Sequence, residues 1–232
     1  MTSQAAIKRT HDAPAVADIG AEPGKTCSLC RRLSDFRARN CEAYPDYFNG
    51  PAPSFGPANA RLLIVGLAPG LHGANKTGRP FTGDYAGDLL YRTLDKFGFS
   101  RGAYAARPDD GLTLVDAMIT NAVRCVPPAN KPTTPEIKSC RPFLTARIAA
   151  LPRLQALVCL GRIAHDSTLA ALGVRAKDAP FAHGAAHEVA DSLVLFDSYH
   201  CSRYNTNTGR LTEAMFEQVF EAVRRRLEGA SA

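Results

Sequence analysis

Four cysteines in two pairs are the side chains of this sequence best suited to chemistry. Cys27 and Cys30 are separated by two residues, and Cys125 and Cys140 by fourteen. Thiolates are soft ligands, so two such pairs can supply four of them to one centre, either a tetrahedral zinc ion or an iron–sulfur cluster. The spacing alone does not decide between these two centres, and it also allows cysteines that bind nothing.

The other three of the seven cysteines do not fit this pattern. Cys159 lies within an apolar stretch and is predicted to be a core residue. Cys41 is close to the first pair and is the one rival ligand, whereas Cys201 has no partner in the pattern. No apolar leader precedes the first pair, so we expect a cytoplasmic protein, in which a CxxC pair more often binds metal than forms a structural disulfide.

A glycine-rich segment, GLAPGLHGANKTGRPFTGDYAG, is the second candidate and begins at Gly66, at the end of a predicted strand. It lacks the Lys-Ser/Thr ending of a phosphate-binding P-loop and the G-x-G-x-x-G spacing of a dinucleotide fold. Glycines let a ligand approach the backbone closely, and Phe81 offers it an aromatic face. Asp84 is the only carboxylate between Gly66 and Tyr85. It could orient a water molecule, cap the helix that follows, or do both.

Two further polar residues stand at the ends of predicted strands. Asn121 ends an apolar run, and its amide presents both a donor and an acceptor, as the edge of a nucleobase requires. The simpler alternative is an asparagine that forms a turn. His200 opens the segment HCSRYNTNTGRLT. A single histidine at a strand end is more often structural, so its residue type alone does not assign it a role.

The elements that must position these residues alternate between strand and helix. Apolar runs predict strands over residues 61–66, 117–123, 154–160 and 193–199. Helices are predicted over residues 87–97, 134–150, 161–172 and 211–227, with Thr134 as the N-cap of the second and Pro135 in its first turn. This order predicts a three-layer α/β/α sandwich with a mostly parallel central sheet. The loops after Val65, Asn121 and Tyr199 should then meet at one edge of the sheet, where such folds bind ligands.

Length and charge set wider limits. The 232 residues, 45% of them hydrophobic, suffice for one domain, predicted over residues 25–232 after a polar, disordered tail at 1–24. The net charge of +6 suits an anionic partner. Between residues 121 and 153, six basic residues stand against one acidic residue, which predicts either a solvated face or a path for DNA. No apolar run is long enough to span a membrane.

Taken together, these motifs resemble the iron–sulfur uracil-DNA glycosylases. The glycine-rich segment and the NTGRLT ending of the segment after His200 resemble family 5 (type B) of that superfamily, over roughly Cys27 to Leu227. The resemblance implies a monomeric base-excision repair enzyme that hydrolyses the N-glycosidic bond of uracil in DNA and leaves an abasic site. It would also accept other deaminated bases such as hypoxanthine. No lysine is placed to form a Schiff base with the sugar, so strand cleavage is not expected.

The resemblance also implies roles for particular residues. A [4Fe–4S] cluster would be held by Cys27, Cys30, Cys125 and Cys140, with a structural purpose. Catalysis would rest on Asp84, Asn121 and His200: a water-orienting carboxylate, an amide that reads uracil, and a donor to uracil O2. Substrate binding would also involve Gly66, Ala68, Phe81, Arg203 and Tyr204, with Phe81 stacking on the base and the last two filling the gap in the duplex.

One departure and two alternatives accompany this interpretation. In the related family 4 enzymes the position of Leu67 is typically a glutamate, so in this chain the catalytic role passes to Asp84 and Asn121. The first alternative is a non-catalytic nucleic-acid-binding module with a four-cysteine zinc site. The second is a redox iron–sulfur protein that has no role on DNA.

Overall fold

The fold is built on a five-stranded sheet, and the computed structural model describes residues 21–229. Its strands run in the order β4 (Ala117–Asn121), β1 (Leu62–Gly66), β5 (Ala156–Leu160), β7 (Leu193–Ser198) and β6 (Ala186–Ala190). The first four are parallel, as predicted, whereas β6 pairs antiparallel with β7. The sequence did not predict β6, because its alternating, partly exposed residues are those of an edge strand rather than of a buried one.

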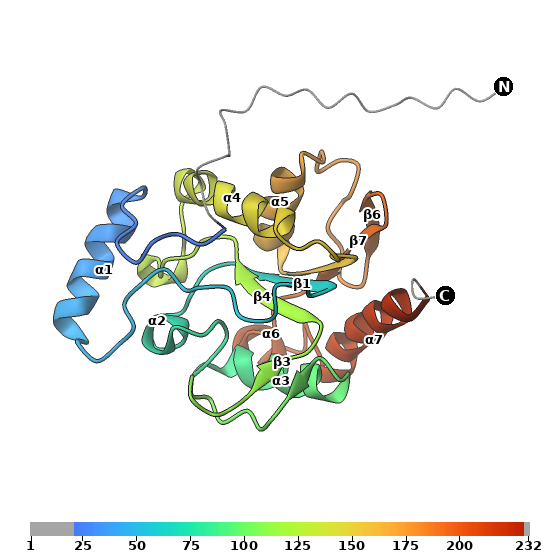
Figure 1. Ribbon diagram of the computed structural model, residues 1–232, viewed down its shortest axis with the longest axis horizontal. Coiled ribbons are helices and arrows are strands. Elements are labelled where there is room, and N and C mark those ends of the chain that lie inside the picture. The colour runs from blue at the N-terminus through green and yellow to red at the C-terminus, as the bar shows by residue number, and fades with distance from the viewer. Residues whose placement is uncertain (1–20, 230–232) are drawn as a thin grey trace.

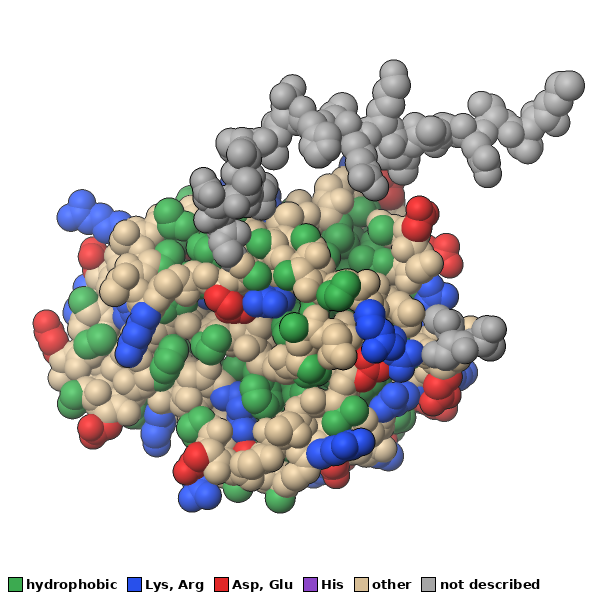
Figure 2. Space-filling model, in the orientation of Figure 1, with side chains coloured by type: hydrophobic (Ala, Val, Ile, Leu, Met, Phe, Trp, Pro, Cys, Tyr) green, Lys and Arg blue, Asp and Glu red, His purple; other side chains and the backbone are tan. Residues whose placement is uncertain are grey.

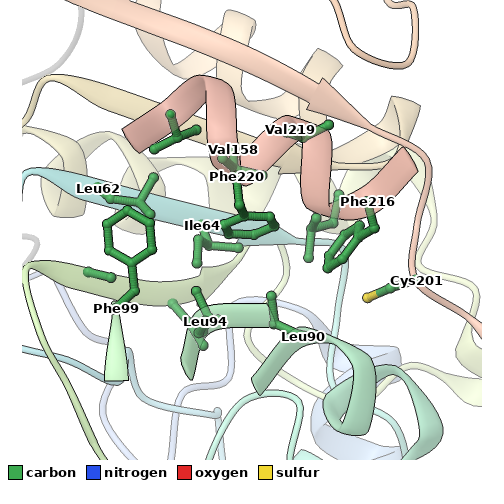
Figure 3. Packing of buried hydrophobic residues seen from close by; sticks show 14 of the residues in the cluster. Leu62, Ile64, Leu90, Leu94, Phe99, Val158, Cys201, Phe216, Val219 and Phe220 are labelled. Carbon is green, nitrogen blue, oxygen red and sulfur yellow. The ribbon is translucent and has the colours of Figure 1, made fainter. Parts of the chain in front are cut away.

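Helices cover both faces of this sheet, which confirms the three-layer sandwich (Figure 1). α3 (Tyr85–Lys96) and α7 (Glu213–Gly229) pack on one face, and α4 (Thr134–Ala149) and α5 (Arg162–Leu172) on the other. The side chains of β1 alternate between the two layers. Leu62 and Ile64 join the core formed with α3 and α7, shown in Figure 3, whereas Leu63 and Val65 join the opposite core. Because both cores are closed, the strand ends are held rigidly.

Several elements outside the main sheet and its four covering helices were not predicted from the sequence. α1 (Arg31–Ala43) precedes the sheet and lies beside it (Figure 1), and it buries only Leu33 and Asn40, so it has little apolar periodicity. The others are α2 (Ala74–Thr77), β2 (Ser100–Arg101), β3 (Thr113–Leu114), the 3-10 turn η2 (Pro128–Asn130) and α6 (Arg203–Asn207). Within residues 21–229, no helix has the length and apolar character that crossing a membrane requires.

The start of α4 differs from the prediction by one residue. Its N-cap is Thr133, not Thr134, because Glu136 completes a capping box with Thr133. The backbone N–H of Thr133 donates to Glu136 Oε2 at 2.7 Å. With Thr134 as the N-cap, Glu136 would stand only two residues after the cap and could not make this reciprocal bond, so the position of Glu136 decides where the helix begins.

The basic stretch at residues 121–153, predicted to be either a solvated face or a path for DNA, is only partly available to a partner, because two of its arginines pair with Glu22. Arg124 is 1% exposed, and its guanidinium contacts Glu22, Thr120 and the carbonyl of Ala52. Arg147 also donates to Glu22, at 2.6 Å. On the face shown in Figure 2, basic side chains are scattered among acidic and hydrophobic ones. The sequence could not reveal this, because the neutralising carboxylate lies about a hundred residues away.

Glu22 lies within the predicted tail, yet it is part of the folded domain. Its carboxylate accepts from Arg124 and Arg147 and also from the backbone N–H of Ser54. The domain therefore extends at least to Glu22, rather than beginning at residue 25. Residues 1–20 of the predicted tail lie outside the described residues.

Glu22→Gln should lower the free energy of unfolding by roughly 2–3 kcal/mol, measured by urea denaturation. The change leaves the buried guanidinium of Arg124 without a carboxylate, which costs about 3–5 kcal/mol for a fully buried pair. We expect less here because the Glu22 side chain is 34% exposed. Asp35→Asn is the matched control, since it removes an exposed pair with Arg31 and should change stability by less than about 0.5 kcal/mol. Equal stability of the Glu22 variant and the wild type would contradict this account.

Candidate active site

A cavity of about 370 Å³ opens where the carboxyl ends of β1, β4 and β7 meet, as predicted for this fold. Six of the predicted site residues line it: Ala68, Phe81, Asp84, Asn121, His200 and Arg203. The remaining lining residues, to which the sequence analysis gave no role in the pocket, are Leu67, Pro69, Gly70, Ala74, Tyr85, Ala86, Asn130 and Ser202. Segments far apart in the sequence thus form one pocket.

Gly66 does not line the cavity but lies directly behind two residues that do. A Cβ atom at Gly66 would lie 2.5 Å from Asn121 Oδ1 and 2.7 Å from the ring of Phe81. Either distance is shorter than a van der Waals contact. The last residue of β1 must therefore be glycine for the amide and the aromatic ring to stand side by side.

Asn121 lines the cavity and carries a buried hydrogen-bond acceptor. The residue is 3% exposed, and its Oδ1 atom has no hydrogen-bond partner among the described residues. A buried carbonyl oxygen without a donor costs about 1–3 kcal/mol, so such an atom is retained only where a ligand or water satisfies it. The site is therefore suited to a ligand that carries an N–H group.

Phe81 is held in an unusual backbone conformation beside Asn121. Its φ angle is +53°, a region that bulky residues rarely adopt. The Phe81 carbonyl accepts from the hydroxyl of Tyr104 at 3.2 Å. It also lies 1.8 Å from where a Cβ atom of Gly87 would be, so only glycine fits there. The ring is 7% exposed, and its centroid lies 6.0 Å from that of His200. Backbone strain at such a site is typical of a preorganised binding surface.

An ion pair that the sequence analysis missed supports the loop around Phe81. Arg79 donates through both terminal guanidinium nitrogens to Asp110, each at 2.7 Å, and its Nε donates to Thr82 at 2.8 Å. The side chains are 5% and 1% exposed. The Arg79 guanidinium also lies over the rings of Tyr91 and Tyr104, 5.4 and 5.7 Å from their centroids. The arginine in the GRPFTG motif was the available signal, but its carboxylate partner is 31 residues away.

Asp84 caps a helix, as the sequence allowed, and also lines the cavity. It is the N-cap of α3, and its Oδ1 accepts from the backbone N–H of Gly87 at 3.0 Å. The other oxygen, Oδ2, faces the glycine-rich loop, 2.7 Å from where a Cβ atom of Gly73 would be. Burial raises the pKa of Asp84 above the usual carboxyl range. One oxygen thus anchors the helix, while the other lies against the glycine-rich loop that lines the cavity.

His200 reaches the cavity from the loop after β7 and is half-buried. Burial lowers the pKa of its imidazole below the ordinary histidine value, so the ring is neutral at neutral pH. Its backbone carbonyl accepts from the Asn205 side-chain amide at 2.8 Å, which ties the loop to α6. A neutral imidazole can donate one hydrogen bond into the cavity without bringing a positive charge to the empty site.

The two residues predicted to contact the duplex differ in position. The guanidinium of Arg203 lies 5.2 Å from the ring centroid of Tyr85, at the cavity wall. Tyr204 does not line the cavity and is 72% exposed. Both lie on α6, beside the opening. Their roles on DNA remain predictions.

The four cysteines predicted as ligands line a second cavity. Cys27, Cys30, Cys125 and Cys140 come together with the apolar residues Leu33, Val123 and Phe143. The rival Cys41 is exposed, and Cys159 and Cys201 are buried in the two main cores, which confirms Cys159 as a core residue. The free volume here is about 10 Å³. Among the described residues, no three Cys, His, Asp or Glu side chains are close enough to hold a single metal ion.

The surroundings of the cysteines suit thiolate ligands. The backbone N–H of Arg124 donates to Cys140 Sγ at 3.3 Å, and the Arg37 guanidinium donates to Cys125 Sγ at 3.6 Å. Burial raises the pKa of Cys125 to about 11 and that of Cys140 to about 12, so both are protonated thiols unless a cation binds them. The donor set, four cysteines around one cavity with N–H donors to two of the sulfurs, is therefore compatible with a thiolate-bound metal centre.

Comparison of the sequence with known proteins shows to which family the chain belongs. The model of the uracil DNA glycosylase superfamily matches residues 53–224. A type-5 uracil-DNA glycosylase of Thermus thermophilus is 43% identical over 205 residues, which cover 86% of this chain and 93% of the relative. One of Pyrobaculum aerophilum is 40% identical over 204 residues, covering 86% and 87%. A type-4 enzyme of the same organism is 33% identical over 142 residues, or 60% of this chain and 64% of the relative. The chain therefore belongs to the uracil-DNA glycosylase superfamily, and within it to the type-5 family.

Proposed function

We propose that this protein is a monofunctional DNA glycosylase that excises uracil, and other deaminated bases such as hypoxanthine, and leaves an abasic site. The observation that carries the proposal is the buried Oδ1 of Asn121, which has no donor within the described chain and belongs to a residue that lines a base-sized cavity together with Phe81. A base turned out of the duplex would stack on Phe81. Its N3–H would donate to Asn121 Oδ1, and its O4 would accept from the amide nitrogen.

The reaction breaks a glycosidic bond through an oxocarbenium-like state as a base anion leaves. His200, which is neutral, would donate to O2 of the leaving uracil and stabilise the developing negative charge. Asp84 Oδ2 would orient or deprotonate the water that attacks C1′. No lysine lines the cavity among the described residues, so the chain offers no amine to form a Schiff base with the sugar. The strand should therefore remain intact.

We also propose that Cys27, Cys30, Cys125 and Cys140 hold a [4Fe–4S] cluster with a structural role. Such a cluster binds each thiolate through a different iron, so it accepts sulfurs that stand farther apart than those around one zinc ion. When bound, it would join the segment before α1 to the proline-rich loop after β4. The alternative of a non-catalytic module with zinc gains no support, because it leaves the cavity around Asn121 unexplained.

Single-turnover assays on a uracil-containing oligonucleotide should show release of the base with the strand uncut. The rate should fall as the pH drops through the raised pKa of Asp84, because only the carboxylate can accept a proton from water. Asp84→Asn should slow release roughly 100-fold, and its rate should no longer fall at low pH, so the acidic limb of the pH–rate profile disappears. DNA affinity should stay near that of the wild type. The rate should be measured from mildly acidic to neutral pH.

Asp88→Asn is the matched control, because this carboxylate lies on the same helix but does not line the cavity. It should keep the rate at neutral pH and retain an acidic limb, displaced slightly to lower pH because the charge of Asp88 helps to raise the pKa of Asp84. An acidic limb that persists in the Asp84 variant would remove Asp84 from the reaction. Failure of the wild type to release any deaminated base would disprove the proposed function itself.

A further inference from the structure

α1 carries several arginines, and one of them differs from the rest in what it faces. Arg32 pairs with Glu136 at 2.7 Å, Arg31 lies 3.8 Å from Asp35, and Arg39 lies over the ring of Phe36 at 5.7 Å. Arg37 is half-buried, and within residues 21–229 it pairs with no carboxylate. A partly buried cation without a carboxylate is unfavourable unless another negative group stabilises it.

The guanidinium of Arg37 is instead directed at the cysteine cavity. Its Nη1 donates to Cys125 Sγ at 3.6 Å, and its Nη2 donates to the carbonyl of Cys27 at 2.7 Å. One planar group therefore joins a ligand from the first cysteine pair to a ligand from the second. The rigid fork of arginine can make both contacts at once, which a lysine ammonium on a flexible stem does less well.

A cluster bound by four thiolates bears a net negative charge, which is costly in an apolar cavity unless nearby cations or N–H donors compensate for it. Glu136, which lies near Cys30, is negatively charged and cannot compensate for the charge of the cluster. Its charge is neutralised by Arg32. Arg37 is the cation whose charge remains available to the sulfurs. Its position on α1 also explains why this helix, which buries little apolar surface, lies against the cavity.

We propose that Arg37 is a positioning residue for the metal centre, which retains the cluster and sets its reduction potential by donating a charged hydrogen bond to the Cys125 thiolate. This inference rests on the proposed [4Fe–4S] cluster. It concerns no catalytic step on DNA, because Arg37 does not line the substrate cavity. Removing the cation should both weaken retention of iron and make the cluster harder to reduce.

The test compares wild type, Arg37→Gln, Arg37→Lys and Arg39→Gln, all purified anaerobically with their native metal. Loss of the visible iron–sulfur absorbance is followed after adding an iron chelator. Arg37→Gln should lose iron roughly 10-fold faster than wild type, in line with the loss of a partner to a metal ligand. Arg39→Gln removes an exposed cation from the same helix and should match wild type. Arg37→Lys should fall between the two.

The midpoint potential separates this role from a merely structural one. When the oxidised cluster takes one electron from the electrode, its negative charge increases, and a nearby cation stabilises that product. The potential of Arg37→Gln should therefore shift to a more negative value, whereas Arg37→Lys, which keeps the charge, should stay near wild type. Iron retention and potential both equal to wild type in Arg37→Gln would overturn the inference. A wild-type protein without iron would overturn the cluster assignment and this inference with it.

Discussion

Asn121→Ala should slow single-turnover release of uracil roughly 100- to 1000-fold, the range expected when one preorganised group in an active site is lost. The side chain is 3% exposed and its Oδ1 has no other partner in the described chain, so no neighbouring group can take over its bond to the base. The variant should also discriminate less between uracil and other bases, because the base edge would be left unpaired.

His200→Ala should show a rate loss of at least 100-fold through a different effect, the loss of a donor to the leaving anion.

Asn207→Ala is the matched control for the amide. Asn207 is exposed at the end of α6 and does not line the cavity, so its loss should leave the single-turnover rate unchanged at saturating enzyme. Thermal unfolding of all variants should be compared first, so that rates are read only from folded protein. Full activity in both Asn121→Ala and His200→Ala would disprove the assignment of this cavity as the active site.

Much of this site follows from the sequence because its residues stand at the ends of strands. Apolar runs located β1, β4 and β7, and parallel strands bring their carboxyl ends to one edge. This topology alone brings Asn121 and His200 into one cavity, although 78 residues separate them. The periodicity also predicted the helical layer on one face of the sheet, because α3 and α7 each present a continuous apolar face to it.

The parts that escaped prediction depend on partners distant in the sequence. The residues next to Arg124 in the sequence give no sign that its side chain is buried, because the carboxylate that neutralises it, Glu22, stands 102 positions earlier in the chain. α1 was not predicted because it is held by contacts of single side chains, such as Arg32 with Glu136, rather than by an apolar stripe. In these cases the local pattern is weak, and a long-range ion pair decides the structure.

Asp110→Asn should lower the free energy of unfolding by about 3–5 kcal/mol, because it leaves the Arg79 guanidinium buried without its carboxylate. Asp109→Asn, one residue away, is the matched control. Its pair with Arg107 is 3.6 Å long between side chains that are 77% and 67% exposed, so the change should be within about 0.5 kcal/mol. Urea unfolding at neutral pH measures both.

The pH dependence gives a second check on the same pair. The Arg79 guanidinium holds the pKa of Asp110 well below the usual carboxyl range. A carboxylate with a depressed pKa contributes stability that is fully present above its unfolded pKa and is lost as the pH falls through its folded pKa. The stability difference between wild type and Asp110→Asn should therefore be constant from neutral to mildly acidic pH and shrink only in strong acid.

The Asp110 variant should also affect the active site, although the residue touches no substrate. Arg79 holds Thr82, and the loop between them carries Phe81 at a φ angle of +53°, which the backbone adopts only under constraint. Once Arg79 is released, Phe81 can relax away from Asn121, so base release should slow even at temperatures where the variant is fully folded. If folded Asp110→Asn releases the base at the wild-type rate, the backbone conformation of Phe81 is maintained without Arg79, by Tyr104 and the close packing of Gly87 alone.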